Sequence, residues 1–471
     1  MDDAPYDAIV VGGGVSGIVA ARDLSRGGLR VILLEGRERL GGRVWTSKTV
    51  GDLGASWVHG GKPGNPVYDL AIEAGLPLRA TDYDASALFD NAGRMSSDAA
   101  AGVWAQFERI ADRMAADIEL QRAAHGSYDY RKTSLRSATE AALAAEGVPP
   151  GSAEERAIRF EAVVEWEHEF GGSAAEMSAA HFDEGAGFAG TDFVFPAHEG
   201  FGAVVCILEQ QLGPSVDLLL GARVTAIASP AEAHAPVQVS VADGRVFRGR
   251  AVVVTLPIGI LHSSLGVSNT AAGGTSAVSF SPPLSPSLAS AALALGCGVY
   301  NKYIVLYEGA AAEAAFASVS TCDMLQFIDE LPSPELPPSA PTTGSLPQLS
   351  HGGWPFPEML NWGRASNGKR LALVAFSAGA EARRLSSMSD AAVRSLLLAQ
   401  VRGVGFVSHC RGVWHPPPIP SSAARYHAAG AACGACRLCP HSLGRGPLFP
   451  MLLLEHCCGR RPDGARRPLL A

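Results

Sequence analysis

The sequence predicts an α/β fold that begins with a Rossmann-like domain. Three observations near the N-terminus predict the first domain: a β-branched run that ends in a glycine-rich turn, a helical pattern behind that turn, and a second β-branched run that ends in an acid. Together they form a βαβ unit of about 30 residues. The chain of 471 residues, 47% hydrophobic and 18% charged, is long enough for a second domain.

The first strand is expected at residues 8–11, and the turn sequence Gly-Gly-Gly-Val-Ser-Gly follows it directly. In such a G-x-G-x-x-G turn, Gly12 allows the chain to reverse sharply and Gly14 lets a pyrophosphate approach the backbone. Gly17 lets the following helix pack close to the strand. The free N–H groups at the N-terminus of the helix then point at the phosphates.

The second and third elements complete this unit. Apolar residues recur at helical spacing from Ile18 to Leu24, until Gly27 stops the helix. A second strand at residues 31–34 ends at Glu35, whose carboxylate can accept hydrogen bonds from both hydroxyls of a ribose and would repel the 2′-phosphate of NADP. A glycine-rich turn alone could be a structural loop, but the strand, helix and acid at this spacing favour a dinucleotide site.

Two segments after the first strand and helix make the assignment more specific. Residues 34–46 read LEGRERLGGRVWT, and residues 52–60 read DLGASWVHG, followed by Gly-Asn-Pro at 64–66. These segments resemble those of the flavin amine oxidases, most closely the polyamine oxidases and the related lysine-specific demethylases. The resemblance implies FAD as the cofactor, a discontinuous Rossmann-like FAD-binding domain, and an α+β substrate-binding domain with a mixed sheet.

The resemblance also implies which residues bind FAD. They are Gly12, Gly14, Gly17, Glu35, Gly42, Arg43, Gly54, Ala55, Ser56, Trp57 and Val224. Arg43 would supply a permanent positive charge beside an anionic cofactor, and the small residues 54–56 would let the main chain lie against the flat flavin ring. Val224, within a stretch at residues 218–227, would place main chain against the adenine.

Two residues are candidates for catalysis. Lys302, in the segment 280–308, matches the flavin-proximal lysine of the family and would hold a water at flavin N5; the alternative is a surface lysine on a strand. His59 matches a position at the substrate tunnel of polyamine oxidases. Its alternative is a hydrogen-bonded structural histidine in the turn at residues 58–60.

The activity that the resemblance implies is oxidation of a C–N bond of a polyamine of the spermine or spermidine type. The resulting imine is hydrolysed to an aldehyde and an amine, while O2 is reduced to H2O2. The partners are therefore a small-molecule polyamine and O2. The alternatives are a catalytically degenerate FAD-fold protein and an oxidase of other amines. A demethylase's docking domain and helical insertion, and a monoamine oxidase's C-terminal membrane helix, are not recognised in the sequence.

Charge and hydropathy restrict the partners further. The net charge is −8, but residues 402–471 hold nine Arg, no Lys and two acids, so the rest of the chain carries −15. The negative electrostatic field of such a chain attracts a polycation and disfavours nucleic acid, although an acidic net charge can also serve solubility alone.

No run reaches the ~18 apolar residues of a membrane span, and no signal peptide or peroxisomal signal is seen, so a cytoplasmic protein is expected. Oligomeric state is not predicted.

A cluster of carboxylates occupies Glu161–Glu169, around Trp166. It could lie over the substrate entrance, but a solvated helix face is the favoured interpretation. A metal site is disfavoured because no second His or Cys is spaced to complete it.

The expected domain boundaries follow the discontinuous pattern of the family. The FAD-binding domain takes residues 1–80 and 196–265, and the substrate domain takes residues 81–195 and 266–400. Within the latter, the Pro-, Ser-, Gly- and Thr-rich stretches 266–279 and 331–356 are expected to be surface insertions.

Residues 401–471 form a divergent tail that is expected to be disordered. The family's closing FAD segment, of the form FAGE followed by GxxxGA, is not found there, and the tail is rich in Arg, Pro and Cys. One hypothesis is an out-of-frame or mis-spliced reading of a GC-rich gene. The competing hypothesis is a zinc or iron–sulfur site, although a well-placed fourth ligand is lacking. Its ligands would come from Cys433, Cys436, Cys439, Cys457, Cys458 and His441 or His456.

Overall fold

The computed structural model describes residues 4–48, 50–90, 92–125, 133–182, 188–195, 200–230, 232, 235–267, 277–306, 316–317, 319–328, 355–365 and 372–403. They form two compact units. Of the described residues, unit 1 contains 4–42 and 208–295, and unit 2 contains 43–207 and 296–403.

Unit 1 is built on a seven-stranded sheet with the order β10-β2-β1-β13-β12-β11-β14. The first four strands are parallel, β13, β12 and β11 form an antiparallel meander, and β14 pairs in parallel with β11. The strands are β1 (Tyr6–Val11), β2 (Val31–Leu34), β10 (Val216–Leu219), β11 (Val224–Ala228), β12 (Val237–Val241), β13 (Val246–Val254) and β14 (Ser279–Ser281). The helices are α1 (Val15–Arg26), α8 (Ile258–Ser264) and α9 (Pro286–Ala294), while α7 (Gly202–Gln210) runs across the boundary at residue 207.

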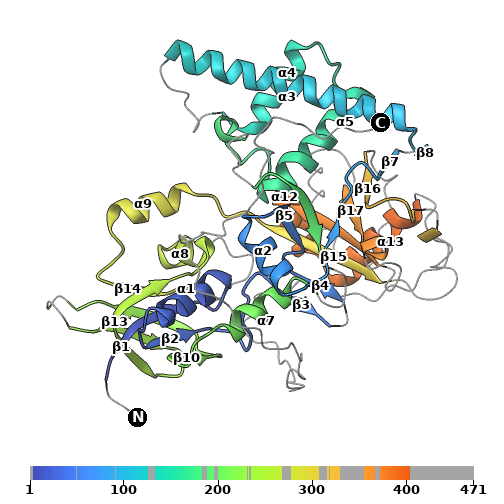
Figure 1. Cartoon of the computed structure of the whole chain (residues 1–471). Helices are drawn as coiled ribbons and strands as arrows, with labels where there is room; N and C mark the ends of the chain where they lie inside the picture. Colours follow the sequence, from blue (N-terminus) through green and yellow to red (C-terminus); the bar gives the residue numbers. More distant parts are fainter. Residues whose placement is uncertain are drawn as a thin grey trace. The chain divides into compact units, whose positions relative to one another are not determined.

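The βαβ unit at the start of unit 1 is present as the sequence predicts. The strand expected at 8–11 begins two residues earlier, the strand at 31–34 has the predicted bounds, and helix α1 ends at Arg26, just before Gly27. Helix α1 packs on β1 and β2 (Figure 1), and its Ile18 and Ala21 are fully buried. Residues 8–11 and 31–34 of these strands are all apolar because central parallel strands are covered on both faces.

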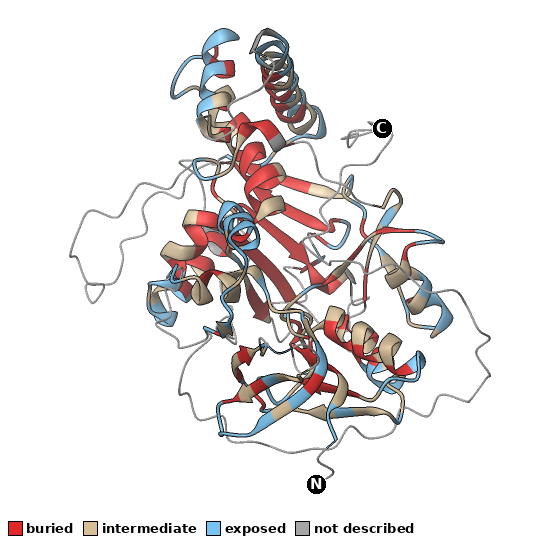
Figure 2. Ribbon diagram, turned by 90° about the vertical axis from the view of Figure 1, so that its left-hand side faces the viewer, coloured by how far each residue is buried: buried red, intermediate tan, exposed pale blue. Residues whose placement is uncertain are grey.

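Unit 2 is built on a six-stranded mixed sheet with the order β15-β18-β17-β16-β7-β8. All neighbouring pairs are antiparallel except β16 and β7, which are parallel. The strands are β7 (Ser86–Asp90), β8 (Gly93–Arg94), β15 (Tyr300–Leu306), β16 (Met324–Phe327), β17 (Glu358–Asn361) and β18 (Ala372–Ala378). Strands β16, β17 and β18 are buried along their whole length, as the red strands of Figure 2 illustrate.

The two faces of this sheet pack into different hydrophobic cores, since side chains alternate along each strand. Tyr303 and Ala375 belong to one core together with Leu385 and Leu397, which lie in α12 (Gly379–Ser386) and α13 (Asp390–Gly403). The neighbouring positions Ile304, Leu360, Val374 and Phe376 belong to the other core. At one end of that second face the apolar residues give way to Lys302, Glu358 and Gln326. The candidate site lies there.

Two smaller sheets and a helical layer complete unit 2. The small sheets contain β3 (Thr46–Ser47) with β4 (Gly51–Asp52), and β5 (Trp57–Gly61) with β9 (Thr191–Val194) and β6 (Arg79–Ala80). The remaining helices are α2 (Pro66–Glu73), α3 (Ser97–His125), α4 (Leu135–Ala145), α5 (Ala153–Ala162), the π-helix η1 (Val163–Glu167), α6 (His168–Phe170), the 3-10 helix η2 (Ala179–His181) and α11 (Trp362–Ala365).

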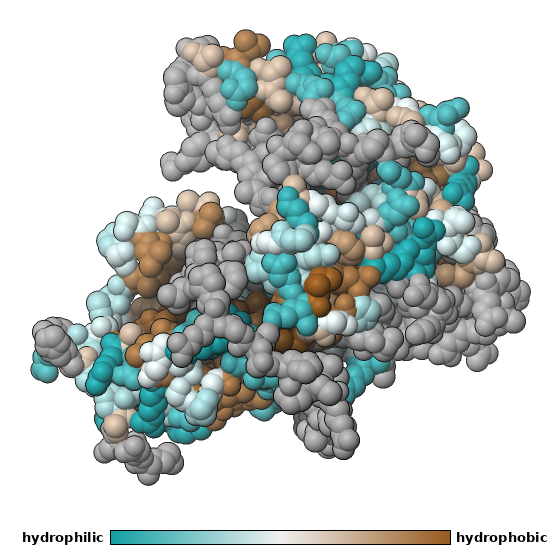
Figure 3. Space-filling model, viewed as in Figure 1, coloured by the Kyte–Doolittle hydropathy of each residue, from teal (hydrophilic) through white to brown (hydrophobic). Residues whose placement is uncertain are grey.

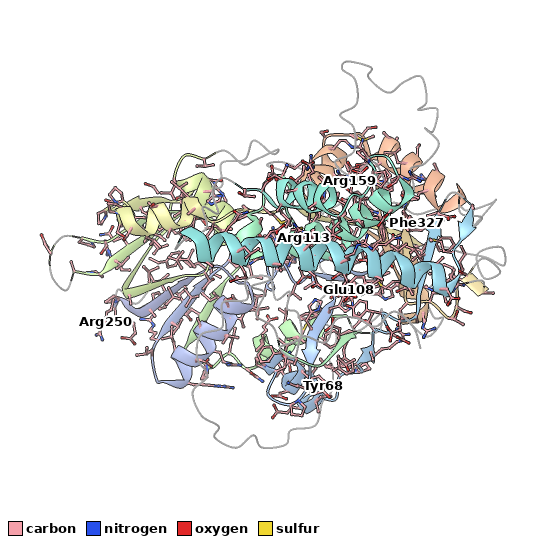
Figure 4. All side chains as sticks on the ribbon, turned by 90° about the horizontal axis from the view of Figure 1, so that it is seen from above. Tyr68, Glu108, Arg113, Arg159, Arg250 and Phe327 are labelled. Carbon is pink, nitrogen blue, oxygen red and sulfur yellow. The ribbon has the colours of Figure 1, made fainter. Side chains whose placement is uncertain are left out.

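Helix α3 packs against α4 and α5 through an aromatic and aliphatic stripe that includes Trp104 and Phe107. Hydrophilic side chains gather on the visible face of this helical layer (Figure 3). Figure 4 shows Arg113 on α3 and Arg159 on α5, and each binds a carboxylate one helical turn away on its own helix. This layer is therefore amphipathic, with its apolar stripe turned inward.

The α/β fold with mixed sheets is confirmed, while the domain boundaries stay a prediction. The compact units change at residues 42, 207 and 295, whereas the sequence-based boundaries stand at 80, 195 and 265. Residues 268–276 and 331–354 of the expected insertions lie outside the described residues, as do residues 404–471 of the tail. At the described ends of the first stretch, residues 266, 267, 277 and 279 are exposed and Val278 is buried, while Phe356 at the end of the second stretch is buried; their interpretation as surface insertions stays a prediction.

Candidate functional site

The glycine-rich turn between β1 and α1 has the geometry that the motif predicts. Gly12 has a φ of +106°, which residues with a side chain rarely adopt. A Cβ on Gly17 would lie 1.8 Å from the carbonyl oxygen of Gly12, so only glycine allows α1 to begin this close to β1. A Cβ on Gly14, the N-cap of α1, would meet nothing within 4 Å. The space beside Gly14 and the first N–H groups of the helix suit a pyrophosphate.

Glu35 lies at this turn and its carboxylate is held in place by two backbone amides. Its Oε2 accepts a hydrogen bond from the N–H of Gly13 at 2.6 Å, and its Oε1 accepts one from Arg37 at 2.8 Å. Each carboxylate oxygen keeps a further lone pair, so the ribose hydroxyls can still bind. The carbonyl of Glu35 also accepts from Ala222, two residues before Val224, which is buried at the start of β11.

The loop after Glu35 folds back on the turn and is strongly basic. The N–H of Gly41 donates to Gly13, and a Cβ on Gly42 would lie 3.1 Å from the Cα of Gly14. Arg37 and Arg39 both donate to the carbonyl of Gly42. Burial, together with the charge of Arg37, lowers the pKa of Arg39 to about 10. The close backbone and the two cations fit an anionic dinucleotide, so unit 1 suits the ADP half of FAD.

Unit 2 contains the residues that the resemblance assigns to the flavin. Arg43 is exposed, and its carbonyl oxygen accepts from Ala55. A Cβ on Gly54 would lie 1.9 Å from that same oxygen, so the two segments approach as closely as glycine permits. Trp57 begins β5 and donates through Nε1 to Thr81 Oγ1 at 3.0 Å. The small residues therefore give a compact main-chain surface, as expected of a segment that lies against a flat ring.

Lys302 lies on β15 and contacts this segment, 248 residues away in the sequence. Its Nζ donates to the carbonyl of Gly54 and to Ser56 Oγ at 2.6 Å. Nζ is 5.8 Å from the ring centroid of Trp57 and 5.9 Å from that of Phe376. Burial lowers the pKa of Lys302 to about 8. The surface-lysine alternative is contradicted by these contacts, while the water-holding role stays a prediction.

Asp52 is a charged neighbour of Lys302 that the sequence analysis did not single out. It is fully buried on β4, where it accepts hydrogen bonds from Thr46 Oγ1 and from the N–H of Phe201 at 2.9 Å. Burial raises its pKa to about 6, against the opposing effects of the Thr46 hydrogen bond and the charge of Lys302. The sequence does contain a feature that could have identified Asp52, because this acid directly precedes the LGAS sequence assigned to the flavin.

His59 is hydrogen-bonded in the way that its structural interpretation requires. Its Nδ1 lies 3.0 Å from Asp192 Oδ2, and the same carboxylate accepts from the N–H of Gly60 at 2.8 Å and from Tyr83 at 3.0 Å. Burial raises the pKa of Asp192, but these hydrogen bonds outweigh it and the net shift is downward. The ring of His59 is 39% exposed and stacks on Trp57, so it remains available to a substrate.

The segment Glu161–Glu169 is not a solvated helix face, and the favoured interpretation is wrong here. Glu161 and Glu167 are each 3% exposed and His168 is 8% exposed. The reason is that hydrophobic cores cover the π-helix η1 on opposite sides. Trp166 packs into the core that contains Phe107, and Val164 packs into a second core that contains Leu88. Burial raises the pKa of Glu167, although a hydrogen bond from Ala174 opposes it.

The described residues contain no group of three or more His, Cys, Asp and Glu side chains arranged to hold a metal ion. The cysteines of the tail lie outside them. No described helix has the length and apolarity needed to cross a membrane.

Comparison with known proteins identifies the family. Residues 15–448 match the model of the flavin containing amine oxidoreductases, a range that reaches into the divergent tail. The chain is 31% identical over 320 residues to polyamine oxidase 4 of Oryza sativa subsp. japonica, covering 65% of this chain and 60% of that protein. It is 30% identical over 321 residues to polyamine oxidase 2 of Arabidopsis thaliana, covering 64% and 58%.

The chain thus spans about 60% of the length of the curated relatives that it matches. Its fold is similar to that of a putrescine oxidase solved with bound putrescine, with a TM-score of 0.60, 19% identity, and coverage of 85% of this chain and 82% of that one. The chain belongs to the flavin containing amine oxidoreductases, and its cofactor is FAD.

Proposed function

We propose that this protein is an FAD-dependent amine oxidase that acts on polyamines of the spermine or spermidine type. The observation that carries the proposal is Lys302, whose partly buried ammonium is held by Gly54 and Ser56 of the segment assigned to the flavin. Bound FAD would supply the acceptor for the hydride removed from the carbon next to the amine nitrogen. The imine is hydrolysed to an aldehyde and an amine, and O2 is reduced to H2O2.

The protein's own residues would control protonation and position. With a pKa of about 8, Lys302 exchanges its proton near neutral pH, and its hydrogen bonds fix the point at which a water can be held. Trp57 and Phe376 lie beside it and provide apolar surface for the methylene chain of a substrate. The reacting amine has to be neutral, whereas the other nitrogens of a polyamine remain cationic and need acidic partners. The domain boundaries and the roles of His59 and Val224 are part of this proposal.

The test is the visible absorption spectrum of the purified full chain, followed by anaerobic addition of spermine. An oxidised-flavin spectrum that bleaches supports the proposal. A flavin spectrum that bleaches with a monoamine and not with spermine favours an oxidase of other amines. A colourless protein that added FAD does not reconstitute favours a degenerate FAD-fold protein, the alternative raised by the missing closing motif.

A further inference from the structure

The carboxylate of Asp52, at the end of β4, is held from two directions. Thr46 Oγ1 donates to it across the β3–β4 pair, and the N–H of Phe201 donates to Oδ1 at 2.9 Å and to Oδ2 at 3.1 Å. The N–H of Gly202, the first residue of α7, donates in turn to Thr46 Oγ1 at 2.7 Å. These hydrogen bonds join β3, β4 and the start of α7 (Figure 1). The N-terminus of a helix favours a negative charge, so Asp52 can be ionised although it is buried.

The same carboxylate lies near Lys302. Asp52 and Gly54 are two residues apart, so their Cα atoms are at most roughly 7 Å from each other. The carbonyl of Gly54 accepts a hydrogen bond from Lys302 Nζ. Val50 and Ile304, each two residues away from one member of the Asp52–Lys302 pair, belong to the same hydrophobic core. The acid and the amine are thus enclosed in one apolar region, where each charge acts strongly on the other.

Asp52 opposes the effect of burial on Lys302. Burial lowers the pKa of Lys302, the charge of Asp52 raises it, and the resulting value is about 8. The other contacts of Nζ are uncharged: Gly54, Ser56, Trp57 and Phe376. Glu358 is two strands away from Lys302, or roughly 10 Å, and its Oε1 is 3.9 Å from Nδ1 of His168. His59 of β5 is bound to Asp192.

The protonation state of Lys302 decides how many hydrogen bonds it can donate. An ammonium has three N–H donors, and Gly54 and Ser56 accept two of them. The third can be donated to a water. A neutral amine has two donors, and both would already be used by the same two residues. Lys302 can therefore donate to a water only while it is protonated.

We propose that Asp52 is a positioning residue for Lys302, because its buried carboxylate keeps Lys302 in the ammonium form and ties the segment that holds this ammonium to the start of α7. The inference rests on the proposed function, in which Lys302 holds a water. It adds the group that keeps Lys302 able to do so, and it assigns Asp52 no contact with substrate or cofactor.

The test is a direct titration of Lys302 by NMR. The full chain is isotope-labelled at the Cε atoms of lysine and is titrated with and without added FAD. Lys302→Met identifies the signal of Lys302 among those of the few lysines, which are Lys48, Lys62, Lys132, Lys302 and Lys369. Asp52→Asn keeps the size of the side chain and an acceptor for Phe201, but removes the charge. In this variant we expect the pKa of Lys302 to fall by about one pH unit or more.

Thr46→Val is the matched control, because it removes a hydrogen bond of Asp52 and releases the N–H of Gly202 but keeps the charge. Asp52 should remain ionised at the pH at which Lys302 titrates, so the pKa of Lys302 should stay close to that of the wild type. A purely structural role of Asp52 predicts a different result, since both variants loosen the same connection. An equal fall of the pKa in both variants therefore overturns the inference.

The wild type provides a test that needs no variant. Asp52 has a pKa of about 6, so the signal of Lys302 should show a second, smaller step near that pH, where Asp52 gains its charge. Asp52→Asn should lack this step. If the wild-type signal is flat through that pH range, the inference is overturned even when Asp52→Asn fails to fold.

Anaerobic addition of spermine separates the inference from the proposed function. A lowered pKa of Lys302 in Asp52→Asn alone, together with a wild-type flavin that spermine does not bleach, supports the inference and overturns the proposed function. A wild-type flavin that spermine bleaches, together with the same pKa of Lys302 in the wild type and in Asp52→Asn, overturns the inference and leaves the proposed function standing.

Discussion

Replacing Gly17 with alanine should destabilise unit 1, although alanine is the better helix former. In an exposed helix the substitution would gain about 1 kcal/mol. Here the new Cβ would lie 1.8 Å from the carbonyl oxygen of Gly12 and 3.0 Å from Thr255 Oγ1. The obstructing oxygen is backbone, so α1 has to move by about 1 Å, and overpacking of this kind costs about 1–3 kcal/mol. We expect a net loss in the free energy of unfolding and weaker FAD binding, because the helix N-terminus is displaced.

Gly102→Ala is the control for this prediction. Gly102 lies within α3, and a Cβ there would meet nothing within 4 Å. The same substitution should stabilise unit 2 by about 0.5–1 kcal/mol. Scanning calorimetry and urea unfolding followed by circular dichroism measure both variants. The reasoning is refuted if Gly17→Ala is as stable as the wild type, or if the two variants change stability in the same direction.

Three further predictions concern single residues of unit 2. Burial holds the pKa of Lys302 at about 8, against an ordinary 10.5. Between these two pH values the unfolded chain binds more protons than the folded chain, so the free energy of unfolding rises with pH, by about 3 kcal/mol in total. The urea midpoint should therefore be higher at pH 10 than at pH 8, and Lys302→Met should lack this rise. Asp192→Asn weakens the hydrogen bonds with His59 and Gly60 and should lower the free energy of unfolding by about 1–3 kcal/mol; an unchanged melting temperature would contradict this. Asn65→Ala removes the N-cap of α2 and should cost about 1–2 kcal/mol, which hydrogen exchange in residues 66–73 would reveal.

The parts of the fold that the sequence predicts are those set by neighbouring residues. The strand, turn, helix and second strand of unit 1 follow from periodicity and from glycine positions within about 30 residues. Their bounds agree with the structure to within a few residues. The family resemblance also pointed to Lys302, although nothing near it in the sequence indicates its contacts with Gly54 and Ser56.

The parts that the sequence does not predict depend on contacts between distant residues. Asp192 binds His59 across 133 positions, and Glu358 reaches His168 only because β17 pairs with β18. The carboxylates of Glu161–Glu169 were misjudged because a helix with acids at regular spacing normally turns them toward solvent. Here two cores cover the helix from opposite sides, and Glu161 and Glu167 are buried with it.

The π-helix at Val163–Glu167 also determines how this helix responds to the insertion or deletion of a residue. Each residue of an α-helix advances the side-chain direction by about 100°, and a π-turn accommodates one extra residue without lengthening the rest of the helix. Deleting one residue from this segment would restore continuous α-helix and would leave the flanking helices in the same register. Gly171 anchors the far end by accepting from Val299, and α5 keeps its packing against α3. The gain or loss of one residue at this turn would therefore be absorbed locally, without turning the helical layer.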